Sequence, residues 1–465
     1  MNDRFIPDTI AQCDAINYQE ILDGDTRAVP AALRERAVPD IGTDSVPVAH
    51  YTSPAIFAES IEKVWMKTWQ MACREEEIPN PGDYYIYDVV GKSLIVSRGE
   101  DGEIRALHNS CLHRGRKLVT QNGSKPEFRC PFHGFIWSND GTFLHNPIEF
   151  DFSHCPKDKM RLPEAKVALW GGFVFVNFDF DAPSLESIIH PIPEHFKRWA
   201  LEDKYIAAHV AKRTRANWMI TAEAFMETHH DIGTHPQILP FITDANAQYD
   251  IFSDHVTRHI SGRGYQSPFI TDRVLTQDEI VAAWIGRPGT GRGRVMIKDP
   301  DLKVPDGMTA RTYVSELARR SLEEQTGYDC SDAADCELGD SLIYNVFPNL
   351  SVWGGFTPNT VYRWRPVGTR YNESMMEIYR LQRIPKDQTR PSPAPMHLLE
   401  DHESWASAEE LGGLGAVIDQ DWSNMEAMQE GLEASATGVV QFGHYLEMRI
   451  RQQHMTFEAY LNRNS

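Results

Sequence analysis

The stretches CLHRG (residues 111–115) and CPFHG (residues 130–134) decide the fold of the N-terminal part of this chain. Each stretch holds one Cys and one His, and sixteen residues lie between the first His and the second Cys. Two thiolates and two imidazoles in such pairs can hold a [2Fe–2S] cluster, with both Cys on one iron and both His on the other. Because imidazoles are neutral, that cluster accepts an electron at a higher potential than an all-Cys cluster, which suits a relay of single electrons. The four candidate ligands are Cys111, His113, Cys130 and His133.

A structural Cys2His2 zinc site is the alternative, since zinc takes the same two ligand types. Zinc motifs usually place both Cys in one pair and both His in the other, whereas both pairs here are mixed. Gly115 and Gly134 flank the ligands, and glycines at such places let backbone N–H groups approach the sulfurs of a cluster. The pattern therefore favours an iron–sulfur cluster over zinc.

The pattern Cys-x-His-Arg-Gly followed by Cys-Pro-x-His-Gly resembles that of the Rieske family. The resemblance implies that these loops belong to a Rieske [2Fe–2S] domain. The surrounding sequence predicts a small β-rich unit, because residues 83–90, 93–97 and 103–107 read as short strands separated by glycine-containing turns. An Asp140-Gly141 hairpin signal follows the second stretch.

The length and composition of the chain limit which classes of protein it can belong to. The 465 residues allow roughly two to four domains with a sizeable core. A net charge of −20 argues against nucleic acid or an anionic membrane as a partner, since both would repel the chain. The first thirty residues do not resemble a signal peptide, and the longest apolar stretch, 167–176, is too short to span a membrane. The five Cys outside the two stretches show no framework spacing, so we expect reduced thiols and a cytoplasmic location.

Three segments follow from the patterns along the chain. We expect an N-terminal arm over residues 1–45, the Rieske [2Fe–2S] domain over 46–165, and a catalytic domain over 166–465. The catalytic domain contains an expected insertion at about 260–340, with helices near 278–284 and 312–324. Further expected elements are a helix over 218–232, strands at 341–346, 350–356, 360–365 and 374–381, and a helical region over 423–460.

A second candidate metal site lies in the stretch ETHHDIGTHP, residues 227–236. On a helix, Glu227 and His230 share a face because they are three residues apart. His235 would lie roughly 140° round an unbroken helix, so the helix must bend or stop before it. Gly233 permits a break, and Pro236 disfavours helical geometry at His235. Two imidazoles and a distant carboxylate would form a facial triad for non-haem Fe(II), whereas the plainer alternative is a surface helix with solvated histidines.

This stretch is similar to the iron-site helix of Rieske ring-hydroxylating oxygenases. The resemblance implies that His230 and His235 bind iron and that Glu227 is the carboxylate linking the two metal centres, which leaves His229 a less expected ligand. Two departures stand out. The linking acid is Asp in the best-known members but Glu here, and the usual Glu-Asn-Phe reads Glu-Ala-Phe at 223–225.

The third ligand is expected from the C-terminal part. Residues 419–432, DQDWSNMEAMQEGL, resemble the family segment in which an Asp precedes a Glu by five positions and a Gln-x-Gly by eight. Asp421 fits that register, with Asp419 as the second choice. The resemblance implies an α+β fold in which the β-rich Rieske domain adjoins a catalytic domain with an antiparallel sheet covered by helices, helix-grip-like. It also implies a homotrimer or a trimer with a small β subunit.

The function implied is that of the terminal oxygenase, or α-type subunit, of a Rieske non-haem iron system. It would use O2 and electrons from NAD(P)H, delivered by a reductase with or without a ferredoxin, to mono- or cis-dihydroxylate a hydrophobic aromatic or alicyclic substrate. Two alternatives are an O- or N-demethylating monooxygenase and an iron–sulfur electron-transfer protein without oxygenase activity. The expected pocket is apolar, and a large anionic substrate would need a basic clamp, for which Arg263 and Arg273 are weak candidates. The expected pocket residues are Phe225, Met226, Ile238, Leu239, Phe241, Phe347, Trp353 and Trp422.

Overall fold

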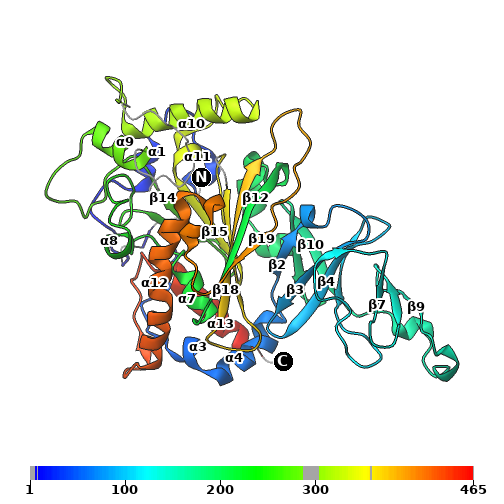
Figure 1. The fold of residues 1–465 in the computed structure, drawn as a ribbon. Helices are drawn as coiled ribbons and strands as arrows, with labels where there is room; N and C mark the ends of the chain where they lie inside the picture. Colours follow the sequence, from blue (N-terminus) through cyan, green and yellow to red (C-terminus); the bar gives the residue numbers. More distant parts are fainter. Residues whose placement is uncertain (1–5, 8, 286–302, 357–358, 464–465) are drawn as a thin grey trace.

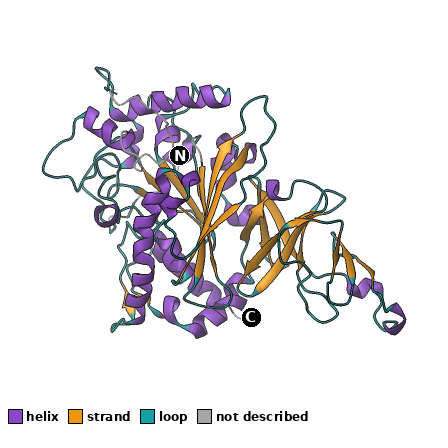
Figure 2. Cartoon of the chain, in the orientation of Figure 1, coloured by secondary structure: helices purple, strands orange, loops and turns teal. Residues whose placement is uncertain are grey.

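The computed structural model describes residues 6–7, 9–285, 303–356 and 359–463. Its two large sheets lie next to one another, the first in the blue and cyan part of the chain and the second at the centre of the molecule (Figure 1). Most described helices surround the central sheet, whereas the other sheet has mainly loops around it (Figure 2). This α+β arrangement confirms the expected fold class.

The first sheet has the strand order β2-β11-β10-β5-β4-β3-β6, with antiparallel neighbours throughout. The three strands expected at 83–90, 93–97 and 103–107 are confirmed as β3, β4 and β5. A three-stranded sheet, β7-β8-β9, lies beside it and frames the second cluster loop. The bounds are β2 Gln70–Arg74, β3 Asp83–Val89, β4 Lys92–Arg98, β5 Ile104–His108, β6 Gly123–Ser124, β7 Glu127–Arg129, β8 Ile136–Ser138, β9 Phe143–His145, β10 Glu164–Trp170 and β11 Phe173–Asn177.

The expected division at residue 165 falls inside strand β10 of this sheet. β10 pairs with β5 at one side and with β11 at the other, so the sheet continues to Asn177. The division between the two domains stays a prediction at this position.

The central sheet has the order β13-β14-β15-β16-β17-β18-β12-β19. Its neighbours are antiparallel except for β12 and β19, which run parallel. The four strands expected between residues 341 and 381 are confirmed as β15 to β18, whereas the remaining four had no clear signal. The bounds are β12 Lys204–Thr214, β13 Gln248–Ile251, β14 Val256–Ser261, β15 Ser341–Val346, β16 Leu350–Trp353, β17 Asn359–Pro366, β18 Ser374–Arg383 and β19 Met396–Leu399.

Buried polar contacts join the two sheets. Arg363 of β17 donates to the Tyr85 hydroxyl of β3 at 3.0 Å and pairs with Glu377 of β18. Asn349 accepts from the backbone N–H of Met71 at 3.0 Å. Because each of these groups is buried, its hydrogen-bond partner across the junction fixes how the two sheets sit together.

Three helices lie beside the central sheet: α7 Trp218–Glu223, α12 Gly413–Glu433 and α13 Met448–Leu461 (Figure 1). The short helix α8 Asp231–Thr234 lies farther out, on the other side of α12. The single helix expected over 218–232 is wrong, because α7 ends at Glu223 and a turn precedes α8. The C-terminal helical region starts ten residues earlier than expected, and the short strand β20 Val439–Val440 divides it. Apolar residues along one face of α12 account for its early start.

The two helices expected in the insertion are confirmed as α9 Gln277–Ile285 and α10 Ala310–Thr326. Residues 286–302, also within the expected insertion, lie outside the described residues. No described helix is long and apolar enough to cross a membrane. The remaining elements are α1 Tyr18–Leu22, α2 Ala31–Arg34, β1 Val46–Pro47, α3 Ala49–Thr52, α4 Pro54–Ser60, η1 Ile61–Trp65, η2 Glu75–Glu77, η3 Glu149–Asp151, η4 Lys157–Met160, α5 Leu185–Ile189, α6 Ile192–Phe196, η5 Lys197–Trp199, η6 Leu201–Asp203, α11 Asp335–Gly339, η7 Trp405–Ser407 and η8 Glu409–Leu411.

Candidate metal centres

The two candidate cluster loops fold in the same way. In each loop the Cys N–H donates to the carbonyl five residues later, at 2.9 Å for Cys111 and 2.8 Å for Cys130. The N–H of the glycine four residues later donates back to the Cys carbonyl, at 2.8 Å for Gly115 and 2.9 Å for Gly134. Both glycines have a φ of 74°, which favours a residue without a Cβ. The repeated pattern in the sequence therefore produces two matching turns that present a Cys and a His each.

These turns bring the four candidate ligands to one place. The rings of His113 and His133 have centroids 4.6 Å apart, and His113 stacks on Phe135 at 4.6 Å. Cys111 and Cys130 are buried, and the pKa of the Cys111 thiol is raised, chiefly by burial and further by the neighbouring Cys130. Nδ1 of His113 is buried and finds no hydrogen-bond partner among the described residues. Two adjacent thiols and an imidazole nitrogen left open fit the donor set of a [2Fe–2S] cluster.

The second centre gathers His230, His235 and Asp421. One ligand atom from each lies within 4.8 Å of the others. Oδ1 of Asp421 is 2.8 Å from Nε2 of His235 and 3.4 Å from Nε2 of His230. His230 stands at the start of α8, His235 directly follows its end, and Asp421 lies in the middle of α12. Because α8 ends before His235, the side chain of His235 can turn towards His230, as the sequence predicts.

The second ring nitrogen of each histidine in this trio also lies within hydrogen-bond distance of a side-chain oxygen. Nδ1 of His230 lies 2.6 Å from Oε1 of Glu227, and Nδ1 of His235 lies 2.8 Å from Oε1 of Gln420. A histidine that binds a metal usually gives its other N–H to such an acceptor, which fixes its tautomer and ring orientation. The donor set, two imidazoles and one carboxylate, fits non-haem iron.

The carboxylates of this site stay ionised although they are buried. Burial opposes ionisation of Asp421, but hydrogen bonds from His230 and His235 keep its pKa below the usual value. Burial likewise opposes ionisation of Glu227, yet His230 and His229 hold its pKa well below its usual range. Both carboxylates are thus ionised at neutral pH, which favours a bound cation.

Asp419, the second choice for the carboxylate ligand, lies elsewhere. It accepts from the Trp405 N–H at 2.8 Å and from the Ser404 hydroxyl at 2.6 Å. Two residues correspond to about 200° on a helix, so Asp419 and Asp421 point to opposite sides of α12. The structure brings Asp421 alone of the two to the histidines.

A cavity of about 30 Å³ adjoins the trio of His230, His235 and Asp421. Of the expected pocket residues, Phe225 and Trp353 line it, and Tyr362 completes an aromatic wall with ring centroids 4.7 Å from Phe225 and 6.3 Å from Trp353. Sequence reasoning missed the apolar face of α12, which was detectable because its members precede Asp421 by seven, four and three positions. That face consists of Leu414, Val417 and Ile418.

The other expected pocket residues do not line this cavity. Ile238 and Phe241 pack against α9 and α10, Phe347 packs where the two domains meet, and Trp422 meets Trp405 edge-to-face. Met226 and Leu239 are buried outside the lining. The two arginines considered as a basic clamp are also elsewhere, since Arg263 donates to Ser341 and Arg273 pairs with Glu279.

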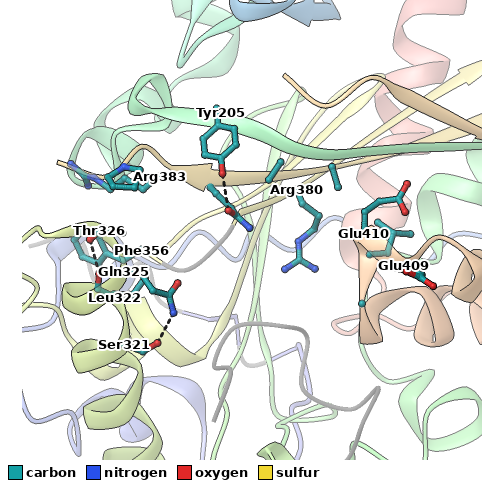
Figure 3. A pocket seen from close by; sticks show the side chains of 16 residues that line it. Tyr205, Ser321, Leu322, Gln325, Thr326, Phe356, Arg380, Arg383, Glu409 and Glu410 are labelled. Atoms are coloured by element: carbon teal, nitrogen blue, oxygen red, sulfur yellow. Dashed lines mark hydrogen bonds between the residues drawn. The ribbon is translucent and has the colours of Figure 1, made fainter. Parts of the chain in front are cut away.

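A second, larger cavity of about 470 Å³ lies between β12, β18, the C-terminal half of α10 and η8. Figure 3 shows Arg380 extending into it from β18, with Glu409 and Glu410 on one side and Gln325 and Ser321 on the other. Its lining is mixed in charge, and none of the candidate metal ligands belongs to it.

Two family models and several known proteins match this chain. Residues 68–153 match the family described as the Rieske [2Fe-2S] domain, and residues 194–462 match the ring hydroxylating alpha subunit (catalytic domain). The carnitine monooxygenase oxygenase subunit of Acinetobacter baumannii is 26% identical over 251 residues, which span 53% of this chain and 67% of that protein. The glycine betaine monooxygenase oxygenase subunit of Pseudomonas aeruginosa is 25% identical over 276 residues, 56% of this chain and 64% of that protein.

The fold is shared with solved structures. A quaternary ammonium Rieske monooxygenase superposes with a TM-score of 0.61 at 17% identity, covering 92% of this chain and 100% of that one. The catalytic-domain match alone spans more than half of the 465 residues. The chain therefore belongs to the Rieske oxygenases, as a ring-hydroxylating alpha subunit with its [2Fe–2S] domain and its iron-binding catalytic domain.

Proposed function

We propose that this chain is the terminal oxygenase component of a Rieske system. In this proposal Cys111, His113, Cys130 and His133 hold the cluster, and His230, His235 and Asp421 hold the mononuclear iron. Three observations support this: ligand atoms of His230, His235 and Asp421 lie within 4.8 Å of one another, the rings of His113 and His133 have centroids 4.6 Å apart, and the thiol of Cys111 neighbours that of Cys130. When bound, the cluster supplies single electrons and the iron supplies oxygen activation. A reductase, with or without a ferredoxin, would provide electrons from NAD(P)H.

For the substrate we propose a quaternary ammonium or N-methyl compound, the demethylating alternative rather than a hydrophobic ring. The supporting observation is the lining of the cavity beside the trio. Phe225, Trp353 and Tyr362 supply aromatic faces, and Glu227, Asp231 and Asp421 supply carboxylates. None of the described residues that line it is Lys or Arg. Aromatic faces attract quaternary ammonium groups, and the absence of a basic partner leaves that attraction unopposed.

The size of the cavity supports the same choice. About 30 Å³ is room for a methyl-sized group, much less than the cavities that enclose whole organic ligands. An N-methyl or N-methylene carbon would reach the trio between the aromatic side chains, and the rest of the cation would lie outside this cavity. One oxygen atom would enter a C–H bond beside nitrogen and the other would leave as water, consuming two electrons and two protons. The hydroxylated carbon would then leave the nitrogen as an aldehyde.

The chain's own residues would orient and shield this chemistry. Glu227 and Gln420 hold the two imidazoles by their second nitrogens. The apolar face of α12 excludes water from the far side of the cavity. The assembly as a homotrimer, or as a trimer with a β subunit, remains part of the proposal.

Substrate-dependent oxidation of the chemically reduced cluster tests this function. Glycine betaine, L-carnitine and choline should each be compared with naphthalene, with product analysis for the released amine and aldehyde. We expect turnover with at least one trimethylammonium compound, and Tyr362→Ala should raise its KM about tenfold because a desolvated cation–π contact contributes roughly 1–2 kcal/mol. Turnover of naphthalene alone would contradict the proposed substrate class and support the hydrophobic ring instead.

A further inference from the structure

Glu227 lies in a turn between two helices, and its backbone belongs to neither of them. Seven residues, 224–230, lie between the end of α7 and the start of α8. Hydrogen bonds to side chains that are distant in the sequence stabilise this turn instead. Arg449 of α13 donates to the carbonyl of Met226 at 2.8 Å, and the Thr228 N–H donates to the hydroxyl of Tyr249 at 3.3 Å. The backbone of the turn is therefore fixed, but the orientation of the Glu227 carboxylate depends on its own contacts.

Two histidines divide that carboxylate between them. Oε1 of Glu227 lies 2.6 Å from Nδ1 of His230. Oε2 lies 2.8 Å from Nδ1 of His229, a close contact whose angles are not those of a hydrogen bond, and it accepts from the backbone N–H of His230 at 3.1 Å. Behind His229, its Nε2 lies 3.9 Å from Oε1 of Glu447, at the start of α13. Glu447, His229, Glu227 and His230 thus follow one another in a line from α13 to the candidate iron site.

His229 has no place among the proposed iron ligands, which are His230, His235 and Asp421. We propose that His229, backed by Glu447, is a positioning residue. It holds Oε2 of Glu227 so that Oε1 stays on His230 and fixes the ring of that ligand. This inference rests on the proposed role of His230 as an iron ligand, and it extends that role to a residue and a helix outside the trio.

The proposed role of His229 predicts how its loss combines with the loss of the Glu227 carboxylate. A metal-ligating imidazole is oriented by the acceptor on its other nitrogen, and loss of such a partner typically costs 10–100-fold in metal affinity or activity. If His229 acts only through Glu227, its removal must have no further effect once the Glu227 carboxylate is gone. If His229 binds the metal directly, the two losses must multiply. A double-mutant cycle separates these cases, because residues in one network are not additive.

The experiment is a titration of metal-depleted full-length protein with Fe(II). The variants are His229→Leu, Glu227→Gln and the double variant, and the mononuclear site is read by the spectrum of its Fe(II)–nitric oxide complex. We expect His229→Leu to weaken Fe(II) binding about tenfold or more. In a Glu227→Gln background the same change should have almost no effect. His229→Asn, whose amide can donate near the position of Nδ1, should recover most of the affinity, and Glu447→Gln should fall between.

The matched control is His402→Leu, an exposed histidine that neither lines the cavity beside the trio nor contacts Glu227, and this variant should bind Fe(II) as the parental chain does. Equal affinity in His229→Leu and the parental chain would overturn the inference and leave the proposed function intact. Multiplying losses in the double variant would also overturn it, because His229 would then act on the metal itself. Failure of the parental chain to bind Fe(II) would contradict the proposed function and this inference together.

Discussion

Glu227 is the residue at which the two proposed metal centres would communicate. Glu is one methylene longer than the Asp of the family's best-known members, and in this structure its carboxylate lies 2.6 Å from Nδ1 of His230. Glu227→Gln preserves shape but weakens these charge-assisted bonds. We expect it to keep both centres when Fe(II) is in excess and to lose nearly all turnover, with Glu227→Asp partly active. Single-turnover measurements on pre-reduced protein check this, and electron transfer in Glu227→Gln at the parental rate would rule out the linking role.

His229 and His230 are neighbours with different expected roles. His230→Ala removes a nitrogen that faces Asp421, so we expect loss of the mononuclear iron with the visible spectrum of the cluster unchanged. His229→Gln should retain that iron when Fe(II) is supplied. Iron analysis and the visible spectrum of both variants provide the test. Equal iron loss in the two variants would show that the ligand register is wrong, and loss of the cluster colour in His230→Ala would show that the sites are not separate.

The second cluster loop depends on one backbone conformation. Gly134 has a φ of 74°, and a Cβ there would lie 3.2 Å from Cγ of Pro147. Gly134→Ala should therefore combine a left-handed penalty of about 1–2 kcal/mol with crowding, and reduce cluster incorporation. Gly102→Ala is the matched control, since Gly102 has a φ of 82° and open space around its Cβ position. We expect full cluster absorbance in Gly102→Ala and a clear loss in Gly134→Ala; the same absorbance in both would contradict this account of the loop.

The elements that sequence patterns predicted well are those whose side chains follow a simple period. β15 has the bounds expected from its apolar run, and α9 and α10 begin within about two residues of their predicted starts. β13 and β14 escaped notice because Asp250 and Arg258 interrupt the apolar pattern, and only their buried pairing at 2.7 Å makes both strands compatible with the core. The break after α7 was not predictable from the local sequence, because contacts from distant residues hold the turn.

The residues of the candidate site were predictable where they belong to short sequence motifs. The cluster loops, His230, His235 and Asp421 all follow from spacing together with family resemblance. The cavity was not predictable in the same way. Its aromatic wall joins Phe225 from the turn after α7 to Trp353 and Tyr362 from neighbouring strands, and only the fold brings these residues together.

At the scale of the whole molecule, acid should destabilise the fold. Burial lowers the pKa of His50 and His195 to about 3 and that of His255 to about 4. In the unfolded chain these groups titrate near 6.5, so below that pH the unfolded state binds more protons and stability falls until the folded values are reached. Each histidine contributes up to about 1.4 kcal/mol per pH unit in this window. Urea unfolding between pH 7 and 4 checks this; His195→Gln should lessen the pH dependence, and an unchanged slope would contradict it.

The central claim is that one chain carries two separate iron centres. Iron, acid-labile sulfide and zinc should be measured per chain in anaerobically purified, Fe(II)-supplemented protein. The account predicts about three irons and two sulfides with visible absorption from the cluster. Two irons and two sulfides would leave an electron-transfer protein without an oxygenase site, and zinc without visible absorption would contradict the cluster itself.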